Sequence, residues 1–376
     1  MLRGIVVLFC LALGYNMAFA QVDQTWRYYY PEFKENAGSN LYFRLENNNF
    51  VKNNEYFGNY IEGYTMMGYT VQPTFVYYAG SRLRIKAGIH AIQYSGMDNF
   101  TEILPTFSIH ANLSDKLDLI MGGLQGDVHH KLIEPVFNPE NQYNRPIENG
   151  FQFLYNTQNI WVDVWIDWEQ FIFLGDDKPE KFTAGISSEI TLTNSESFWN
   201  ISIPAQMVAT HLGGQISNYS ESMQSIANLV TGLKFKHRLG DGFIQDIGFS
   251  TYIASYHDLT AQSGWDFTNG SAIYPVAEVG YKYGVLMAGY WKAHNFLSPK
   301  GSPLFQSTSN YKTGYYSEYR DLVTAKLSFT KTFMKQIKFS AMVETYFDIP
   351  AKQLDYSYGL NLVFTPNFFI SKVKFD

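Results

Sequence analysis

The densest group of residues that could do chemistry lies at 125–148. This stretch contains Asp127, His129, His130 and Glu134, and histidine and carboxylate side chains spaced this closely could bind a divalent metal ion. Adjacent histidines in an irregular segment rarely converge on one ion, however. We therefore interpret them as surface histidines of a loop and expect no metal site.

A second stretch, 292–315, holds residue types that serve in ester hydrolysis. A nucleophilic serine needs a histidine to activate it and a third polar group to orient that histidine. His294, Ser298 and Ser302 are close in sequence, but no Gly-x-Ser-x-Gly motif or oxyanion-hole signal accompanies them. We interpret this stretch as an external loop, with folding into the interior as the alternative. No catalytic residue, cofactor or enzymatic activity is expected.

The first twenty residues have the pattern of a secretory signal peptide. Arg3 supplies the positive charge, residues 5–13 form a short apolar run, and residues 18–20 (Ala-Phe-Ala) fit a cleavage site. Cys10 lies within that run and is the only cysteine. We expect residues 1–20 to be removed on export, which would leave a chain with neither disulfides nor thiolate chemistry.

The composition excludes several classes of protein. Only 16% of residues are charged, 17% are aromatic, and the net charge is -6. Nucleic-acid binders concentrate Lys and Arg, so no nucleic-acid partner is expected. The 46% of hydrophobic residues argues against intrinsic disorder. No apolar run near twenty residues follows the leader, so no membrane-spanning helix is expected either.

Hydrophobic residues instead recur with period two, which indicates strands with one apolar and one polar face. The clearest examples are 82–90 and 161–171, and similar alternation recurs at 182–192, 323–331, 337–347 and 354–364. Short turns alternate with long polar stretches at 125–148, 211–225, 256–269 and 292–315. This rhythm is typical of a transmembrane antiparallel β-barrel with short periplasmic turns and long external loops. We predict an all-β barrel of about 16 strands, within a range of roughly 14–18, with a soluble β-sandwich as the alternative.

On these segments the chain resembles porin-like outer-membrane β-barrel proteins of Gram-negative bacteria, of the Bacteroidota type. The resemblance implies an outer-membrane location, contact with membrane lipid and, by analogy with sixteen-stranded porins, a homotrimer. We assign 58–376 to the barrel and the Asn/Tyr-rich segment 21–57 to a periplasmic tail or partial plug. Four prolines inside strand-like runs should mark bulges or strand ends, because proline cannot donate to a ladder. They are Pro73, Pro105, Pro204 and Pro275.

The polar face of such a barrel would line a lumen, and charged residues gather there. The candidate pore-lining residues are a basic row with a nearby histidine (Arg82, Arg84, Lys86, His90), an acidic row (Asp163, Asp167, Glu169) and three further charges (Lys326, Lys338, Glu344). Opposed rows of charge would orient polar solutes in a constriction. The same charges could equally pair with one another and fill the interior.

Three function classes follow from this sequence. We expect a channel for passive diffusion of small hydrophilic solutes. The alternative is a non-catalytic barrel subunit of an outer-membrane secretion, assembly or uptake complex. A lipid hydrolase of the outer membrane, with Ser298 as its nucleophile, is the third.

Overall fold

The structure is a computed structural model that describes residues 33, 38–220, 222–260 and 264–373. The expected signal peptide, most of 21–39 and the last three residues lie outside this part of the chain. Among the described residues, no helix is both long and apolar enough to cross a membrane.

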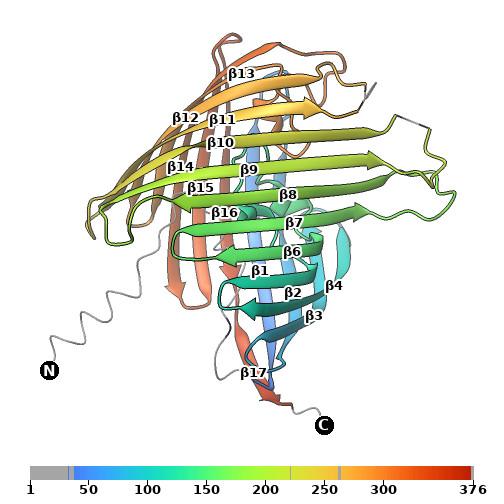
Figure 1. The fold of residues 1–376 in the computed structure, drawn as a ribbon, viewed down its shortest axis with the longest axis vertical. Helices are drawn as coiled ribbons and strands as arrows, with labels where there is room; N and C mark the ends of the chain where they lie inside the picture. Colours follow the sequence, from blue (N-terminus) through green and yellow to red (C-terminus); the bar gives the residue numbers. More distant parts are fainter. Residues whose placement is uncertain (1–32, 34–37, 221, 261–263, 374–376) are drawn as a thin grey trace.

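The described chain forms a single antiparallel sheet closed into a barrel (Figure 1). Its strands are β1 (Asn40–Glu55), β2 (Thr65–Tyr78), β3 (Leu83–Tyr94), β4 (Glu102–Ser114), β5 (Leu117–Gly123), β6 (Asn149–Asn156), β7 (Ile160–Gln170), β8 (Glu180–Thr191), β9 (Trp199–Gly213), β10 (Gln224–Arg238), β11 (Ile244–Asp258), β12 (Asn269–Tyr281), β13 (Gly284–His294), β14 (Tyr319–Met334), β15 (Ile337–Asp348), β16 (Gln353–Phe364) and β17 (Asn367–Lys372). Short helical turns are η2 (Asp127–His130), α2 (Asn141–Asn144) and η3 (Pro303–Phe305).

Sixteen strand positions make up the wall, which confirms the predicted barrel. From β1 to β16 each strand pairs with its neighbours in sequence, and β1 closes the circle by pairing with β2 on one side and with β16 and β17 on the other. β16 and β17 therefore share one position, interrupted at Thr365 and Pro366. Short turns alternate with longer connections along the chain, as the sequence indicated.

The barrel begins at Asn40, earlier in the chain than residue 58, where the sequence pattern predicted its start. Residues 40–55, expected within a tail or plug, form the closing strand β1. Its alternation is hidden in the sequence because Asn47, Asn49 and Asn53 occupy positions where other strands carry apolar side chains. Asn47 compensates by donating to the Thr70 carbonyl at 2.8 Å, and Asn49 donates to the Asn47 side chain at 2.7 Å.

The prolines do not end strands. All four lie inside β2, β4, β9 and β12. The ladders β2–β3, β9–β10 and β12–β13 each skip pairs beside Pro73, Pro204 and Pro275. Pro105 instead stays in register with Ile89 in an unbroken β3–β4 ladder. At Pro73, Pro204 and Pro275 the missing N–H group is thus accommodated by a local gap in one ladder rather than by a strand end. At Pro105 no gap is needed, because the β4–β5 ladder begins only at Ser108.

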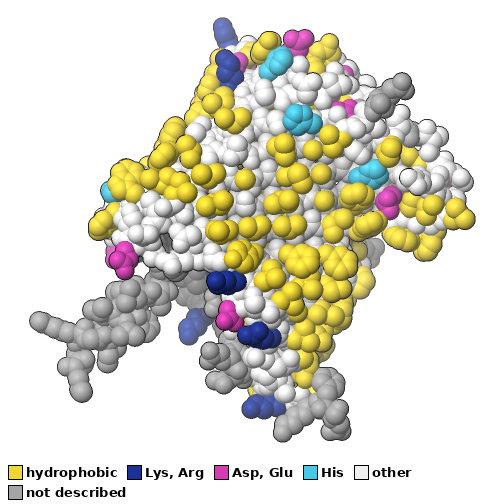
Figure 2. Space-filling view, viewed as in Figure 1, with side chains coloured by type: hydrophobic (Ala, Val, Ile, Leu, Met, Phe, Trp, Pro, Cys, Tyr) yellow, Lys and Arg dark blue, Asp and Glu magenta, His cyan; other side chains and the backbone are white. Residues whose placement is uncertain are grey.

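The outward face of the wall is hydrophobic. Along β10, for example, Leu229 and Leu233 are exposed, whereas the intervening even-numbered Val230 is buried. Figure 2 shows hydrophobic side chains spread across this face, with charged side chains near its edges. This is the distribution that a barrel surrounded by lipid requires.

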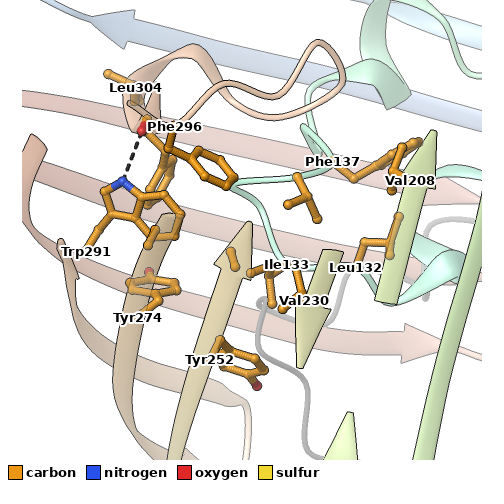
Figure 3. Close-up of a cluster of buried hydrophobic side chains, with 14 of the residues drawn as sticks. Leu132, Ile133, Phe137, Val208, Val230, Tyr252, Tyr274, Trp291, Phe296 and Leu304 are labelled. Carbon is orange, nitrogen blue, oxygen red and sulfur yellow. Dashed lines mark hydrogen bonds between the residues drawn. The ribbon is translucent and has the colours of Figure 1, made fainter. Parts of the chain in front are cut away.

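The interior is filled by two long connections that fold into the barrel. Residues 124–148 bring Leu132, Ile133 and Phe137, and residues 295–318 bring Phe296 and Phe305, into one buried cluster with the wall. Figure 3 shows the side chains of Leu132, Ile133, Phe137 and Phe296 together with those of three residues of the wall, Tyr252, Tyr274 and Trp291. We call the two segments together the plug. Both were expected to be external loops, and that expectation is wrong because their apolar residues are buried within the barrel. For 292–315 the alternative, folding into the interior, is the arrangement that the structure has.

Two close contacts hold the plug in place. The Trp291 indole Nε1 donates to the Phe305 carbonyl at 3.0 Å (Figure 3). Gly301 lies so near the other plug segment that an added Cβ would come within 1.9 Å of the Pro135 carbonyl oxygen. Only glycine permits this approach, which joins the two segments into one unit.

Candidate functional site

The ten candidate pore-lining residues differ in where their side chains lie. Arg82 is exposed at the 79–82 turn, where it pairs with Asp115 at 3.1 Å, and Lys86 and Lys338 are half-buried. The others are buried inside the barrel: Arg84, His90, Asp163, Asp167, Glu169, Lys326 and Glu344.

The acidic row is engaged by the plug. Asp163 Oδ2 lies 2.8 Å from His130 Nδ1, Asp167 pairs with Arg145 at 3.3 Å, and Glu169 pairs with both Arg145 and Lys300. The basic row meets other partners, since Arg84 contacts His110 at 2.6 Å. In the described part of the barrel, these contacts of the acidic row and of the basic row are therefore with other residues and not between the two rows.

His130 is a structural residue of the plug. Its Nε2 lies 2.9 Å from Glu148 Oε2, its Nδ1 contacts Asp163, and its ring stacks on Trp165 with centroids 3.6 Å apart. Burial alone would lower the pKa of His130, but the charges of Glu148 and Asp163 raise it to about 10. The side chain is fully buried, so the expectation of a surface histidine is wrong here. Within the described chain no group of His, Cys, Asp or Glu has a metal-binding arrangement.

The serine and histidine singled out by sequence do not meet. Ser298 is fully buried in the plug, where it donates to the Val136 carbonyl at 3.3 Å and accepts from the Gly301 N–H at 3.1 Å. His294 is exposed at the end of β13 and packs against Tyr319 with ring centroids 4.7 Å apart. Ser298 is therefore not placed for nucleophilic chemistry with His294.

A different serine and histidine are in contact on the outward face. His211 at the end of β9 and Ser225 at the start of β10 are directly paired in the ladder. The His211 Nδ1 lies 2.8 Å from the Ser225 Oγ, and both side chains are half-buried. Ile226, next to Ser225, is buried and points inward, so the pair points outward from the barrel. We refer to these two residues as the outer pair.

Neighbouring strands fix the outer pair. The His211 ring stacks on Phe182, with centroids 5.0 Å apart, and Phe182 stacks on Trp168 at 5.3 Å. Ser225 is held by its backbone, because its N–H donates to the Thr260 hydroxyl at 2.6 Å and its carbonyl accepts from Leu259 at 2.8 Å. The imidazole is thus oriented by an aromatic row across β7, β8 and β9.

An apolar groove of about 370 Å³ lies on the same face, further from the loop end of the strands. Ala205 and Thr231 lie at its centre, with Met207, Leu229 and Ile253 around them. Its edge reaches Ser255, whose Oγ is 3.1 Å from Nε2 of the exposed His257. This is a second Ser–His contact on the outward face, and the outer pair is the shorter and the less exposed of the two.

Sequence reasoning missed the outer pair because its members are 14 residues apart in the chain. His211 and Ser225 stand at the two ends of the stretch 211–225, which was interpreted as one polar loop. The signal that could have found them was the register of the hairpin. Once β9 and β10 are extended to these residues, the two side chains must face each other on one side of the sheet.

Comparison with known proteins gives a family and a fold. The profile of a family described as Lipid A 3'-O-deacylase-type matches residues 33–373. No curated protein matches the sequence. Among solved structures, the outer membrane protein OprD from Pseudomonas aeruginosa is similar with a TM-score of 0.54 at 9% identity, covering 90% of this chain and 98% of that chain. The outer membrane protein OpdK of the same organism gives 0.52 at 10% identity, covering 88% and 100%. A loop-deletion form of OmpT, an outer membrane protein of Vibrio cholerae, gives 0.50 at 10%, covering 87% and 99%.

The structural likeness concerns the fold alone, and it confirms a porin-like β-barrel. Together with the family match, this fold places the protein in the outer membrane. The family description has a different consequence. Lipid A 3'-O-deacylases are enzymes, and this overturns the expectation that the protein is not an enzyme.

Proposed function

Because the chain belongs to the lipid A 3'-O-deacylase-type family, we propose that it hydrolyses a fatty-acyl ester of a lipid A-like glycolipid at the outward face of its barrel. The observation that carries this proposal is the 2.8 Å contact between His211 Nδ1 and Ser225 Oγ on that face. A serine with a histidine in hydrogen-bond reach is the basic requirement for acyl transfer.

The chemistry assigns one role to each member of the outer pair. His211 accepts the Ser225 proton as the hydroxyl oxygen attacks the ester carbonyl, and an acyl–serine bond forms. The bond from the carbonyl carbon to the sugar oxygen breaks, and His211 returns the proton to that oxygen. Water then attacks the acyl–serine by the same route, which releases the fatty acid and restores Ser225.

The position of the outer pair suits a lipid substrate. Both residues lie at the loop end of their strands, beside the aromatic side chains of Trp168 and Phe182. Aromatic side chains gather where the wall of an outer-membrane barrel meets the membrane–water boundary. The ester bonds of a lipid lie at this boundary, between its polar headgroup and its hydrocarbon chains. Such a substrate reaches the outer pair by moving sideways in the membrane, without entering the barrel.

The direct test is acyl release by the folded full chain. Lipid A in mixed detergent micelles is incubated with the purified protein, and the products are identified by mass spectrometry. We expect a lipid A that has lost one ester-linked acyl chain, together with an equal amount of free fatty acid. Intact lipid A after prolonged incubation with protein that migrates as a folded barrel on gels would reject the proposal.

The packed lumen weighs against the passive channel expected from sequence. The cavity beside Lys86 and Glu46 encloses only about 50 Å³, and the one beside Lys52 and Glu344 about 10 Å³. We therefore expect the protein to be silent in single-channel recordings from planar bilayers. A variant in which 125–147 is replaced by a short Gly-Ser linker should conduct. Stable open channels of the unaltered protein would instead favour solute diffusion.

A further inference from the structure

We propose that the apolar groove on the outward face holds one acyl chain of the substrate and determines which chain lengths are hydrolysed. This inference rests on the proposed function, since it uses the outer pair as the point from which the chain extends. The groove lies on the membrane-facing side of an outer-membrane barrel, so a hydrocarbon chain is the occupant that its surroundings supply.

The ladder register connects the groove to the outer pair. Ser225 on β10 is four residues from Leu229 and six from Thr231, which both line the groove. At about 3.4 Å per residue these separations correspond to roughly 14 and 20 Å along the strand. An acyl chain with its ester at Ser225 would therefore reach the groove by running along β9 and β10.

The surface directly beside the outer pair is free of large side chains. One row of paired outward positions separates the outer pair from the groove, and it consists of Ala184, Ala209 and Ala227. Two residues further along, Met207 pairs with Leu229 at the near edge of the groove, and Ala205 pairs with Thr231 at its centre after two more. An acyl chain would contact the backbone closely over the alanine row and would pass Met207 and Leu229 to reach the centre of the groove.

Larger residues stand along the edges of the groove and give it depth. Ile253, on the far side of Thr231, is 59% exposed, and Leu229 is 43% exposed. Small residues in the middle and large ones at the edges leave a furrow on the outward face. A hydrocarbon chain gains dispersion contacts there that it would not gain on a flat wall.

The test fills the groove and follows acyl-chain selectivity. Ala205→Phe places a ring at the centre of the groove, and Ala209→Leu narrows the track leading to it. We expect each to lower the ratio of kcat/KM for a long-chain ester to that for an acetate ester by about tenfold or more, because only the long chain reaches the groove. Ala325→Phe, at an outward position on β14, serves as the control and should leave this ratio unchanged.

A second measurement makes the outcome independent of catalysis. Protein with Ser225→Ala is purified from membranes in mild detergent, and the lipid it retains is quantified by mass spectrometry. We expect the Ser225→Ala protein to retain lipid, and to lose this lipid when Ala205→Phe is added but not when Ala325→Phe is added. That result would support binding of an acyl chain in the groove, even if no ester is hydrolysed and the proposed function fails. Equal selectivity and equal lipid retention in folded Ala205→Phe, Ala209→Leu and Ala325→Phe proteins would overturn the inference.

Discussion

Replacing Ser225 by alanine is expected to lower acyl release from lipid A by at least about 10³-fold, because it removes the nucleophile on which the reaction depends. The fold should be unaffected. Ser225 is held by backbone bonds to Thr260 and Leu259, and its hydroxyl is half-buried on the outward face. Mass-spectrometric product analysis at equal amounts of folded protein measures the change.

Two companion variants sharpen this result. His211→Phe keeps a ring for stacking on Phe182 but removes the base, and we expect a loss of about 10² to 10⁴-fold. Ser255→Ala removes the hydroxyl of the second Ser–His contact and is expected to retain most of the activity. If Ser255→Ala abolished acyl release while Ser225→Ala preserved it, the outer pair would be the wrong assignment.

The second large effect concerns stability. Glu344 on β15 pairs with Lys52 and Lys326, whose side chains are 4% and 5% exposed, and it accepts from the Ser357 hydroxyl at 3.0 Å. Glu344→Ala leaves both lysines buried with part of their countercharge removed. Breaking a buried pair in this way costs about 3–5 kcal/mol. We expect a clear fall in the urea midpoint for unfolding, followed by loss of heat-modifiable migration on gels.

The chain offers a matched control for that measurement. Asp115 pairs with Arg82 at the 79–82 turn, where both side chains are largely exposed to solvent. Exposed ion pairs contribute little to folding, so Asp115→Ala should leave the urea midpoint unchanged. A midpoint that fell equally in the two variants would show that the burial of Glu344 has no special importance.

Strand faces could be predicted from the sequence wherever inside and outside differ in polarity. Residues 161–171 alternate cleanly, and β7 indeed buries Asp163 and Asp167 while exposing Trp168. The same rule failed for β1, because asparagine occupies both of its faces. An alternating pattern is visible only where the two faces of a strand differ in polarity, and in β1 they differ little.

The plug and the outer pair depend on tertiary structure, which periodicity does not describe. Leu132, Ile133 and Phe137 were visible as apolar residues within a polar stretch, but their burial depends on the size of the barrel they enter. His211 and Ser225 depend on the register of a hairpin with a long loop. The sequence does not define the ends of strands to within one residue, so these contacts could not be predicted from it.

The filled interior also determines how this protein would encounter its ligand. With the plug in place, the large open surface for binding is the outward wall, and a molecule bound there is dissolved in the membrane rather than in water. Its effective concentration is then its mole fraction in the leaflet, which dilution of the cell suspension does not alter. Reaction rates should accordingly follow lipid composition and fall when inert lipid is added at constant bulk substrate.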